Sequence, residues 1–126
     1  MIYTETVEEY RVKFYQDSED GVCPVREYIK NLDRRERAKV AKYIEFLRVN
    51  NGYLDEPYSK HIIDKIRELR VDFGRNRHRV FYFTFLKRTV VLLHAFLKKT
   101  AKTPVSEIQK AQKNYQEVVR NPKIYE

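Results

Sequence analysis

Residues 80–97 have the sequence Val-Phe-Tyr-Phe-Thr-Phe-Leu-Lys-Arg-Thr-Val-Val-Leu-Leu-His-Ala-Phe-Leu. Its two apolar runs, Val80–Phe85 and Val90–Leu97, are rich in β-branched, leucine and aromatic side chains, and Lys87–Thr89 joins them. Nearly continuous apolar runs of this length are typical of strands that are covered on both faces. The stretch therefore predicts two neighbouring central strands of a sheet.

Strand alternation extends this sheet on its N-terminal side. Residues 68–73 alternate between charged and apolar side chains, and Gly74–Asn76 supplies a turn into the next strand. A third strand is therefore predicted, and the three adjacent strands form a meander. Arg11–Tyr15 alternates in the same way and predicts a short, half-buried strand.

Two amphipathic helices are predicted between the first strand and the meander. Apolar residues over 25–32 follow the spacing of one helical face, and Pro24 is acceptable in the first turn of that helix. Asp33 with Glu36 resembles a capping box that begins a second helix, and Asn51–Gly52 ends it. The two helices are expected to form an antiparallel hairpin.

A third helix is predicted near the C-terminus. Thr103 is expected to cap it, with Pro104 at its first position, and the tail Arg120–Glu126 is expected to fray. Leu54–Lys60, before the meander, contains a proline and predicts a loop. The expected fold is α+β, with an antiparallel sheet and the element order β-α-α-β-β-β-α.

Length and composition favour one domain over residues 1–126, with a folded core at about 11–118. The chain is 42% hydrophobic and 13% aromatic, with only three glycines and four prolines, which argues against disorder and flexible linkers. The single cysteine, Cys23, has no partner for an internal disulfide and no neighbours with metal-ligand spacing. The N-terminus is acidic and no apolar run is long enough to span a bilayer, so we expect a cytoplasmic protein without membrane contact.

Positive charge is concentrated in one part of the chain. Residues 60–102 contain twelve lysines and arginines, three acidic residues and all three histidines, a net charge of +9 in a chain of net +8. A basic segment interleaved with aromatic residues is expected of a protein that handles nucleic acid. The alternative is a solvated edge strand that carries charge only for solubility. No Gly-rich phosphate loop or paired-histidine metal motif is present, so no cofactor, metal or small-molecule ligand is expected.

Three sequence motifs are more specific than charge. They are the Glu-Leu-Arg strand within Ile66–Val71, the segment Arg79–Tyr82, and the run Leu92–Pro104, which ends in Lys-Lys-Thr-Ala-Lys-Thr-Pro. In this order they resemble the RelE/HigB superfamily of bacterial toxins, and most closely its phage-derived HigB-like branch. The last motif is the most diagnostic because it combines a strand end, three lysines and a helix start in one unbroken run.

The resemblance implies both a fold and a function. It implies a RelE-like fold with the two N-terminal helices on one face of the sheet and the C-terminal helix on the other. It implies a type II toxin that acts as an endoribonuclease on messenger RNA at the ribosomal A site, and that a small helix-turn-helix antitoxin blocks. Two alternatives stay open: a ParE-type toxin that poisons DNA gyrase, and an inactive protein that only binds nucleic acid or the ribosome.

The resemblance also assigns site residues. Carried over position by position, it puts phosphate-binding and transition-state cations at Arg70, at Arg79 and at Lys98 or Lys99. Metal-free RNA cleavage requires that the phosphate charge be neutralised, which arginine and lysine can do directly. His94 is a further candidate for acid–base catalysis because histidine titrates near neutral pH.

The general base stays open at this point. Glu68 stands where some relatives carry a lysine, and the final helix has no clear match for the tyrosine that those relatives carry there. Further RNA contacts are expected from four residues in the basic segment: Arg77, His78, Lys102 and His61. Alternation predicts that Arg77 shares the face of Arg79, that His78 lies on the other face, and that His94 and Lys98 share a face.

Simpler explanations exist for the same residues. Arg70 and Arg79 could be paired with Glu68 and Asp72 on neighbouring strands without any catalytic role. His94 lies in an apolar run and could be a core histidine with its hydrogen bonds satisfied.

Overall fold

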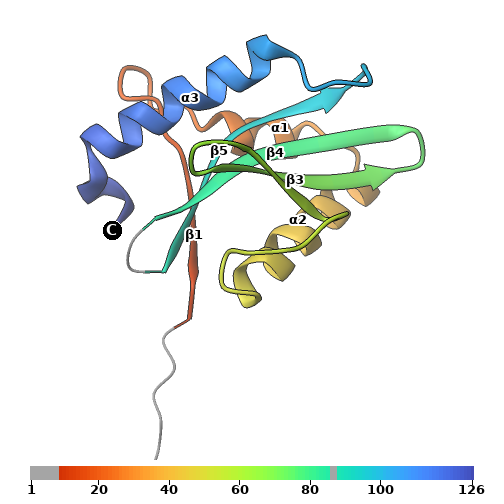
Figure 1. Cartoon of the computed structure of the whole chain (residues 1–126), viewed down its shortest axis with the longest axis horizontal. Coiled ribbons are helices and arrows are strands. Elements are labelled where there is room, and N and C mark those ends of the chain that lie inside the picture. Colours follow the sequence, from red (N-terminus) through yellow and green to blue (C-terminus); the bar gives the residue numbers. More distant parts are fainter. Residues whose placement is uncertain (1–8, 86–87) are drawn as a thin grey trace, which may run out of the picture.

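The computed structural model describes residues 9–85 and 88–126, which form one five-stranded sheet with helices on both faces (Figure 1). Residues 1–8 and 86–87 lie outside the described residues, and Lys87 belongs to the predicted connection between the two central strands. Along the chain the elements are β1 (Arg11–Phe14), α1 (Pro24–Lys30), α2 (Arg34–Val49), β2 (Ser59–Ile63), β3 (Ile66–Phe73), β4 (Asn76–Phe85), β5 (Thr89–Lys98), α3 (Val105–Arg120) and the short 3-10 helix η1 (Pro122–Tyr125).

The strands lie in the order β1-β5-β4-β3-β2, so β4 and β5 are internal, as predicted. The meander β3-β4-β5 is antiparallel throughout. A two-residue loop, Gly74–Arg75, joins β3 to β4, and Gly74 has the positive φ of 58° that such tight hairpins need. The α+β class and the meander are therefore confirmed.

Two predicted details of the sheet are wrong. The segment predicted as a loop runs into an additional strand, β2, which pairs with β3 in antiparallel fashion through a bulge between His61 and Ile63. This irregular, short strand lacks the alternation that sequence patterns detect. In addition, β1 runs parallel to β5, from Arg11 opposite Thr89 to Phe14 opposite Leu92, so the sheet is mixed. Helices α1 and α2 and strands β2, β3 and β4 lie between these two paired strands in the sequence.

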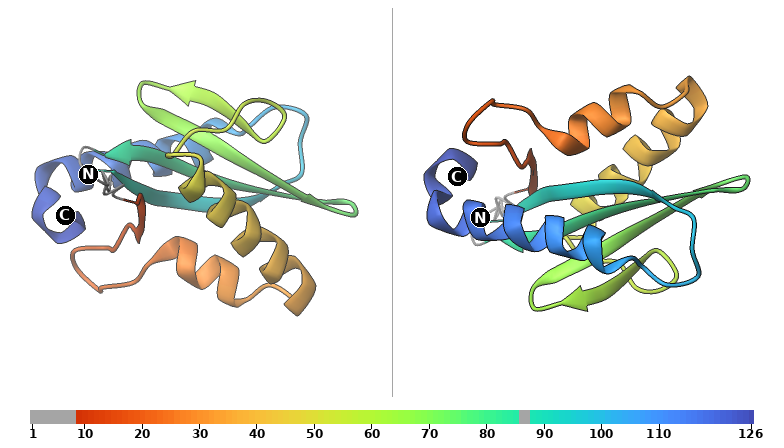
Figure 2. Two further views of the ribbon diagram at one scale, coloured as in Figure 1. Left: turned by 90° about the horizontal axis from the view of Figure 1, so that it is seen from below. Right: turned by 90° about the horizontal axis from the view of Figure 1, so that it is seen from above.

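Side chains on the two faces of the sheet form separate cores, with α3 over one face and α1 and α2 over the other (Figure 2). The α3 side is built from Tyr15, Ile66, Phe81, Phe83, Val91, Leu93, Phe96, Ala111, Val118 and Tyr125. The side of α1 and α2 is built from Val25, Val40, Leu47, Leu69, Val71, Val80, Tyr82, Val90, Leu92 and Ala95. The predicted placement of the helices on opposite faces is therefore confirmed.

The second helix begins and ends where the sequence predicts. The side chain of Asp33 accepts hydrogen bonds from the backbone N–H groups of Arg35 at 2.8 Å and Glu36 at 3.2 Å. At the other end, Asn51 and Gly52 have positive φ angles of 61° and 77°. The Gly52 N–H donates to a carbonyl in the last turn of α2, which satisfies one of the groups that a helix end leaves free.

Two predictions about the C-terminal region are wrong. Pro104, and not Thr103, occupies the cap position of α3, and the Thr103 hydroxyl donates instead to the carboxylate of Glu68 at 3.2 Å. The tail does not fray, because Tyr125 is only 3% exposed and joins the α3-side core. Its hydroxyl accepts a hydrogen bond from the backbone N–H of Gln16 at 3.0 Å, which ties η1 to the segment after β1.

We predict that Gly52→Ala destabilises the fold more than Gly74→Ala. A Cβ at position 52 would lie 2.5 Å from Oγ1 of Thr84, whereas one at position 74 would have no atom within 4 Å. Both substitutions add the cost of a positive φ, about 1 kcal/mol, and Gly52→Ala adds overpacking of about 1–3 kcal/mol. Urea unfolding of both variants measures the difference, and equal losses would contradict the predicted clash.

Candidate active site

Strand pairing places several charged residues of β3, β4 and β5 side by side on the sheet face that α3 covers. Three rows of facing positions result: Glu68 with Phe81 and His94, Arg70 with Arg79 and Phe96, and Asp72 with Arg77 and Lys98. We call these nine positions the site face. The predictions that Arg77 shares the face of Arg79, and His94 that of Lys98, are confirmed by this register.

A buried carboxylate lies at the centre of the site face. The side chain of Glu68 is 0% exposed, and its Oε1 lies 3.1 Å from Nε of Arg70 and 3.6 Å from Nε of Arg79. Its other oxygen, Oε2, accepts the hydrogen bond from Thr103. A buried carboxylate needs such partners, since an unpaired buried charge is very costly. Glu68 therefore ties β3, β4 and the segment before α3 together.

Arg79 is held in place from two sides. It is 5% exposed, and its Nη1 lies 2.7 Å from Oδ1 of Asp72 and donates to the backbone carbonyl of His78 at 3.0 Å. Its buried Nε has no hydrogen-bond partner within the described residues. The carboxylate of Asp72 is 61% exposed. A phosphate could therefore replace this carboxylate without displacing anything from the core.

Lys98 stands at the end of β5 beside these arginines. Burial lowers the pKa of Lys98, and the guanidinium groups of Arg79, Arg70 and Arg77 lower it further, against the opposing effect of Glu68. Each of these neighbours belongs to the site face, so the charges act on one another as a group. A lysine with a lowered pKa releases its proton more readily than an ordinary one, which suits a proton donor.

The other predicted site residues fall into two groups. Lys99 and Lys102 are exposed and follow β5 at the rim of the site face. His94 lies on the site face, but its Nε2 contacts the carboxylate of Glu107 in α3, and its ring stacks at 6.0 Å on that of Phe96. His94 is thus both part of the site face and a histidine with a structural partner.

Two predicted RNA contacts lie away from the site face. His78 is buried on the face of α1 and α2, where hydrogen bonds join its ring to the Tyr28 hydroxyl at 2.6 Å and to the Glu36 carboxylate. His61 lies in the outer strand β2, and its Nε2 is 2.7 Å from the carbonyl oxygen of Asp64. Neither side chain lies on the site face with that of Arg79.

Sequence reasoning missed two residues that shape the site. Thr103 was expected only to cap a helix, and Glu107 was not predicted as a site residue, yet Thr103 binds Glu68 and Glu107 binds His94. Both lie within or just after the lysine-rich motif before α3. The motif follows β5 directly in the sequence. This position beside the strand end is the one feature of the sequence that could have indicated the contacts of Thr103 and Glu107.

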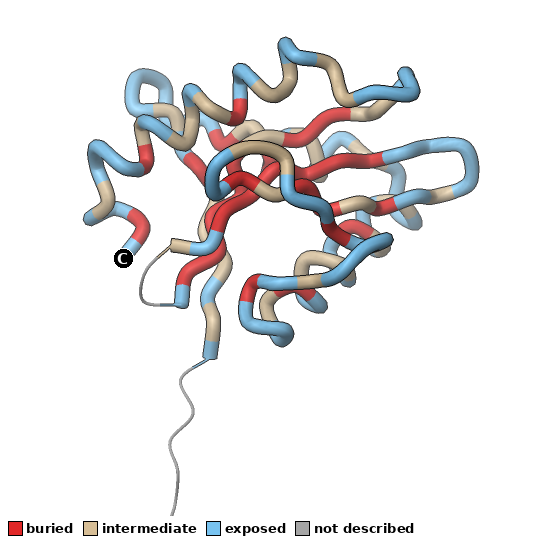
Figure 3. The backbone as a smooth tube through the Cα atoms, viewed as in Figure 1, coloured by how far each residue is buried: buried red, intermediate tan, exposed pale blue. Residues whose placement is uncertain are grey.

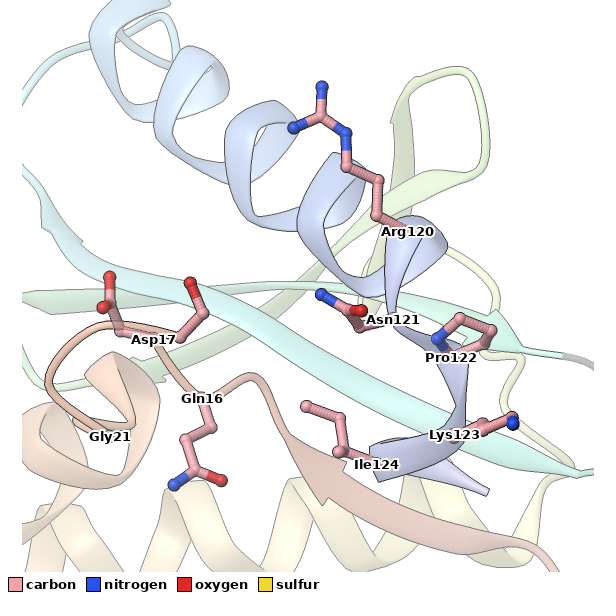
Figure 4. Close-up of a pocket in the computed structure, with 9 residues that line it drawn as sticks. Gln16, Asp17, Gly21, Arg120, Asn121, Pro122, Lys123 and Ile124 are labelled. Atoms are coloured by element: carbon pink, nitrogen blue, oxygen red, sulfur yellow. The ribbon is translucent and has the colours of Figure 1, made fainter.

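A concavity of about 660 Å³ lies away from the site face, between the segment after β1 and the end of α3 (Figure 4). It contains Asp17, whose carboxylate accepts hydrogen bonds from its own loop, and the basic residues Arg120 and Lys123. It holds none of the predicted site residues. Across residues 9–85 and 88–126, no cluster of His, Cys, Asp and Glu side chains suits a metal ion, and no helix is long and apolar enough to cross a membrane.

A comparison with protein-family models gives a match. Residues 27–116 match the family described as "Phage derived protein Gp49-like". This range covers more than half of the chain and includes the whole site face, Thr103 and Glu107. A search of curated proteins found no match.

We predict that Glu68→Gln destabilises the fold far more than Asp72→Asn. Both changes remove a charge at nearly constant volume, but only the first alters a carboxylate that is itself fully buried and is shared by two arginines. The expected loss for Glu68→Gln is about 3–5 kcal/mol, against at most about 1 kcal/mol for the exposed Asp72. Urea unfolding at neutral pH measures both, and similar losses would show that Glu68 does not organise the site face.

Proposed function

The chain belongs to the phage-derived Gp49-like family, a type II toxin family of the RelE/HigB kind, and from this membership we propose that it cuts messenger RNA at the ribosomal A site. Translation then stops until an antitoxin binds. We propose a small helix-turn-helix protein as that antitoxin, and the cytoplasm, where ribosomes work, as the place of action.

The proposed reaction uses the RNA itself as nucleophile. The 2′-oxygen loses its proton and attacks the adjacent phosphorus, and the bond from phosphorus to the 5′-oxygen of the next nucleotide breaks. The products are a 2′,3′-cyclic phosphate and a free 5′-hydroxyl, so water is not consumed in this step. The protein must take one proton, give one proton, and stabilise the extra negative charge of the pentacoordinate phosphorane.

The residues of the site face suit these roles. Arg79 and Arg70 neutralise the phosphate, with Arg79 exchanging the exposed carboxylate of Asp72 for a phosphate oxygen. Lys98 gives its proton to the leaving 5′-oxygen. His94, on the same face, takes the proton of the 2′-hydroxyl. The observation that carries this proposal is the arrangement of Arg70, Arg79 and Lys98 around one buried carboxylate. Burial and the neighbouring guanidiniums lower the pKa of Lys98 there, beside two arginines whose geometry suits a phosphate.

One observation favours a second candidate, a protein that binds the ribosome or RNA without cutting it. Glu68 neutralises part of the charge of both Arg70 and Arg79. This would weaken the stabilisation of a phosphorane more than it weakens binding, because several other cations remain free. The two candidates differ in whether messages are cut.

We predict that Lys98→Gln abolishes message cleavage while the protein still folds. Lys98 is half-buried and makes no ion pair in the described part of the chain, so its loss spares the Glu68 contacts. Loss of a proton donor lowers the rate by about 100-fold or more. The measurement is inducible expression in bacteria with primer-extension mapping of a reporter message, and Lys42→Gln, on the outer side of α2, is the charge-matched control.

The outcomes separate the candidates. New 5′ ends confined to translated regions, seen with the wild type and Lys42→Gln but not with Lys98→Gln, support ribosome-dependent cleavage. Growth arrest by the wild type with intact messages would favour the binding protein, and DNA breaks with a damage response would favour a gyrase poison. Arg79→Ala is a poorer test than sequence alone suggests, because removal of this buried partner of Glu68 also destabilises the fold.

A further inference from the structure

A concavity of about 480 Å³ adjoins the site face at the tip of the β3–β4 hairpin. The hairpin projects beyond the helices, and the end of β5 and the segment that leads into α3 run beside it (Figure 1). Four cations line the concavity: Arg75, Arg77, Lys98 and Lys99. We call it the hairpin pocket. Its residues are largely exposed, in contrast to the buried centres of the strands (Figure 3).

The cations of the hairpin pocket make no direct ion pairs within the described residues, and no acidic residue lines the pocket. Arg70 and Arg79 differ in this respect, since Glu68 and Asp72 bind them. Like charges held together repel one another, so the pocket gains most from an anion that contacts several of them at once.

The pocket also continues the line of the proposed cleavage site. Arg77 and Arg79 point to the same face of β4 two residues apart, a step of about 7 Å along a strand. Consecutive phosphates of a single strand follow one another at a comparable spacing. A chain whose scissile phosphate lies at Arg79 and which runs toward the hairpin tip therefore brings its next phosphate to Arg77 and the pocket.

We propose that the hairpin pocket is a second phosphate subsite, which binds the backbone of single-stranded RNA next to the scissile phosphate through Arg75, Arg77 and Lys99. This subsite rests on the proposed function, since the scissile phosphate defines its position. No aromatic side chain lines it, and its apolar lining is limited to Leu97 and Ala101. It therefore lacks the surfaces on which bases stack and the apolar anchors of a protein interface.

Two consequences follow from this lining. Contacts to phosphates carry no sequence information, so the subsite contributes affinity and not codon preference. A phosphate bound beside Lys98 also favours the charged form of its amine, opposing the effect of the neighbouring guanidiniums. Occupation of the pocket therefore helps to keep a proton on Lys98 until the leaving oxygen needs it.

The test measures binding of RNA that cannot be cut. Single-stranded 2′-O-methyl oligonucleotides of U-rich and A-rich sequence are titrated by fluorescence anisotropy over a range of salt concentrations. The double variant Arg75→Gln/Lys99→Gln is compared with wild type and with Arg34→Gln/Lys42→Gln, which removes the same charge from α2. Since each neutralised phosphate contributes about 0.7 to the slope of log Kd against log salt for single strands, loss of the one phosphate in the pocket should lower the slope by about 0.7.

The expected result is this loss for both oligonucleotides, with the α2 variant close to wild type. Equal effects in the two double variants, no effect of the pocket variant, or no binding by wild type would each overturn the subsite. Poly-glutamate is titrated in the same way as a probe for an acidic protein partner. If the pocket variant binds RNA like the wild type but no longer binds poly-glutamate, the subsite is overturned in favour of such a partner. If the wild type binds RNA through the pocket but leaves messages intact in bacteria, the proposed cleavage is wrong and the proposed subsite stands.

Discussion

The burial of one carboxylate, that of Glu68, is the constraint on which the candidate site depends. A carboxylate removed from water must be met by donors, and here two guanidiniums and a hydroxyl meet it. These partners come from β3, β4 and the segment before α3, so satisfying one charge fixes how the sheet and the last helix meet. The cations of the site face are positioned as a result, and Glu68 offsets part of their mutual repulsion.

The cations around this carboxylate form two populations with different physical properties. The inner pair, Arg70 and Arg79, is compensated and held in place, which suits groups that must meet a phosphate in one geometry. The outer set near the hairpin tip is exposed and makes no direct ion pairs within the described residues, which suits long-range attraction of a polyanion and weak, sequence-independent contact. Lys98 lies between the two and is influenced by both. The inner arginines are therefore suited to holding an anion in one geometry, and the outer cations to attracting it from a distance.

The sequence predicts those parts of the site that depend on local periodicity. Alternation within each strand is enough to place Arg77 on the face of Arg79, and His94 on the face of Lys98. Contacts between distant segments have no such signal. The bond from Thr103 to Glu68 spans 35 residues and depends on where α3 packs, and His78 is buried because α1 and α2 supply its partners. The prediction missed β2 because this short strand contains a bulge and its side chains do not alternate between polar and apolar.

The parallel pairing of β1 with β5 has a consequence for how the protein is made. Arg11 in β1 and Thr89 in β5 lie opposite each other in the sheet but 78 residues apart in the sequence. During synthesis β1 therefore has no partner strand until β5 has also left the ribosome. Thr103, which completes the shell around Glu68, emerges later still. Closure of such distant contacts is a late and slow event in folding. A nascent chain therefore cannot assemble its cationic centre while most of it is still being synthesised.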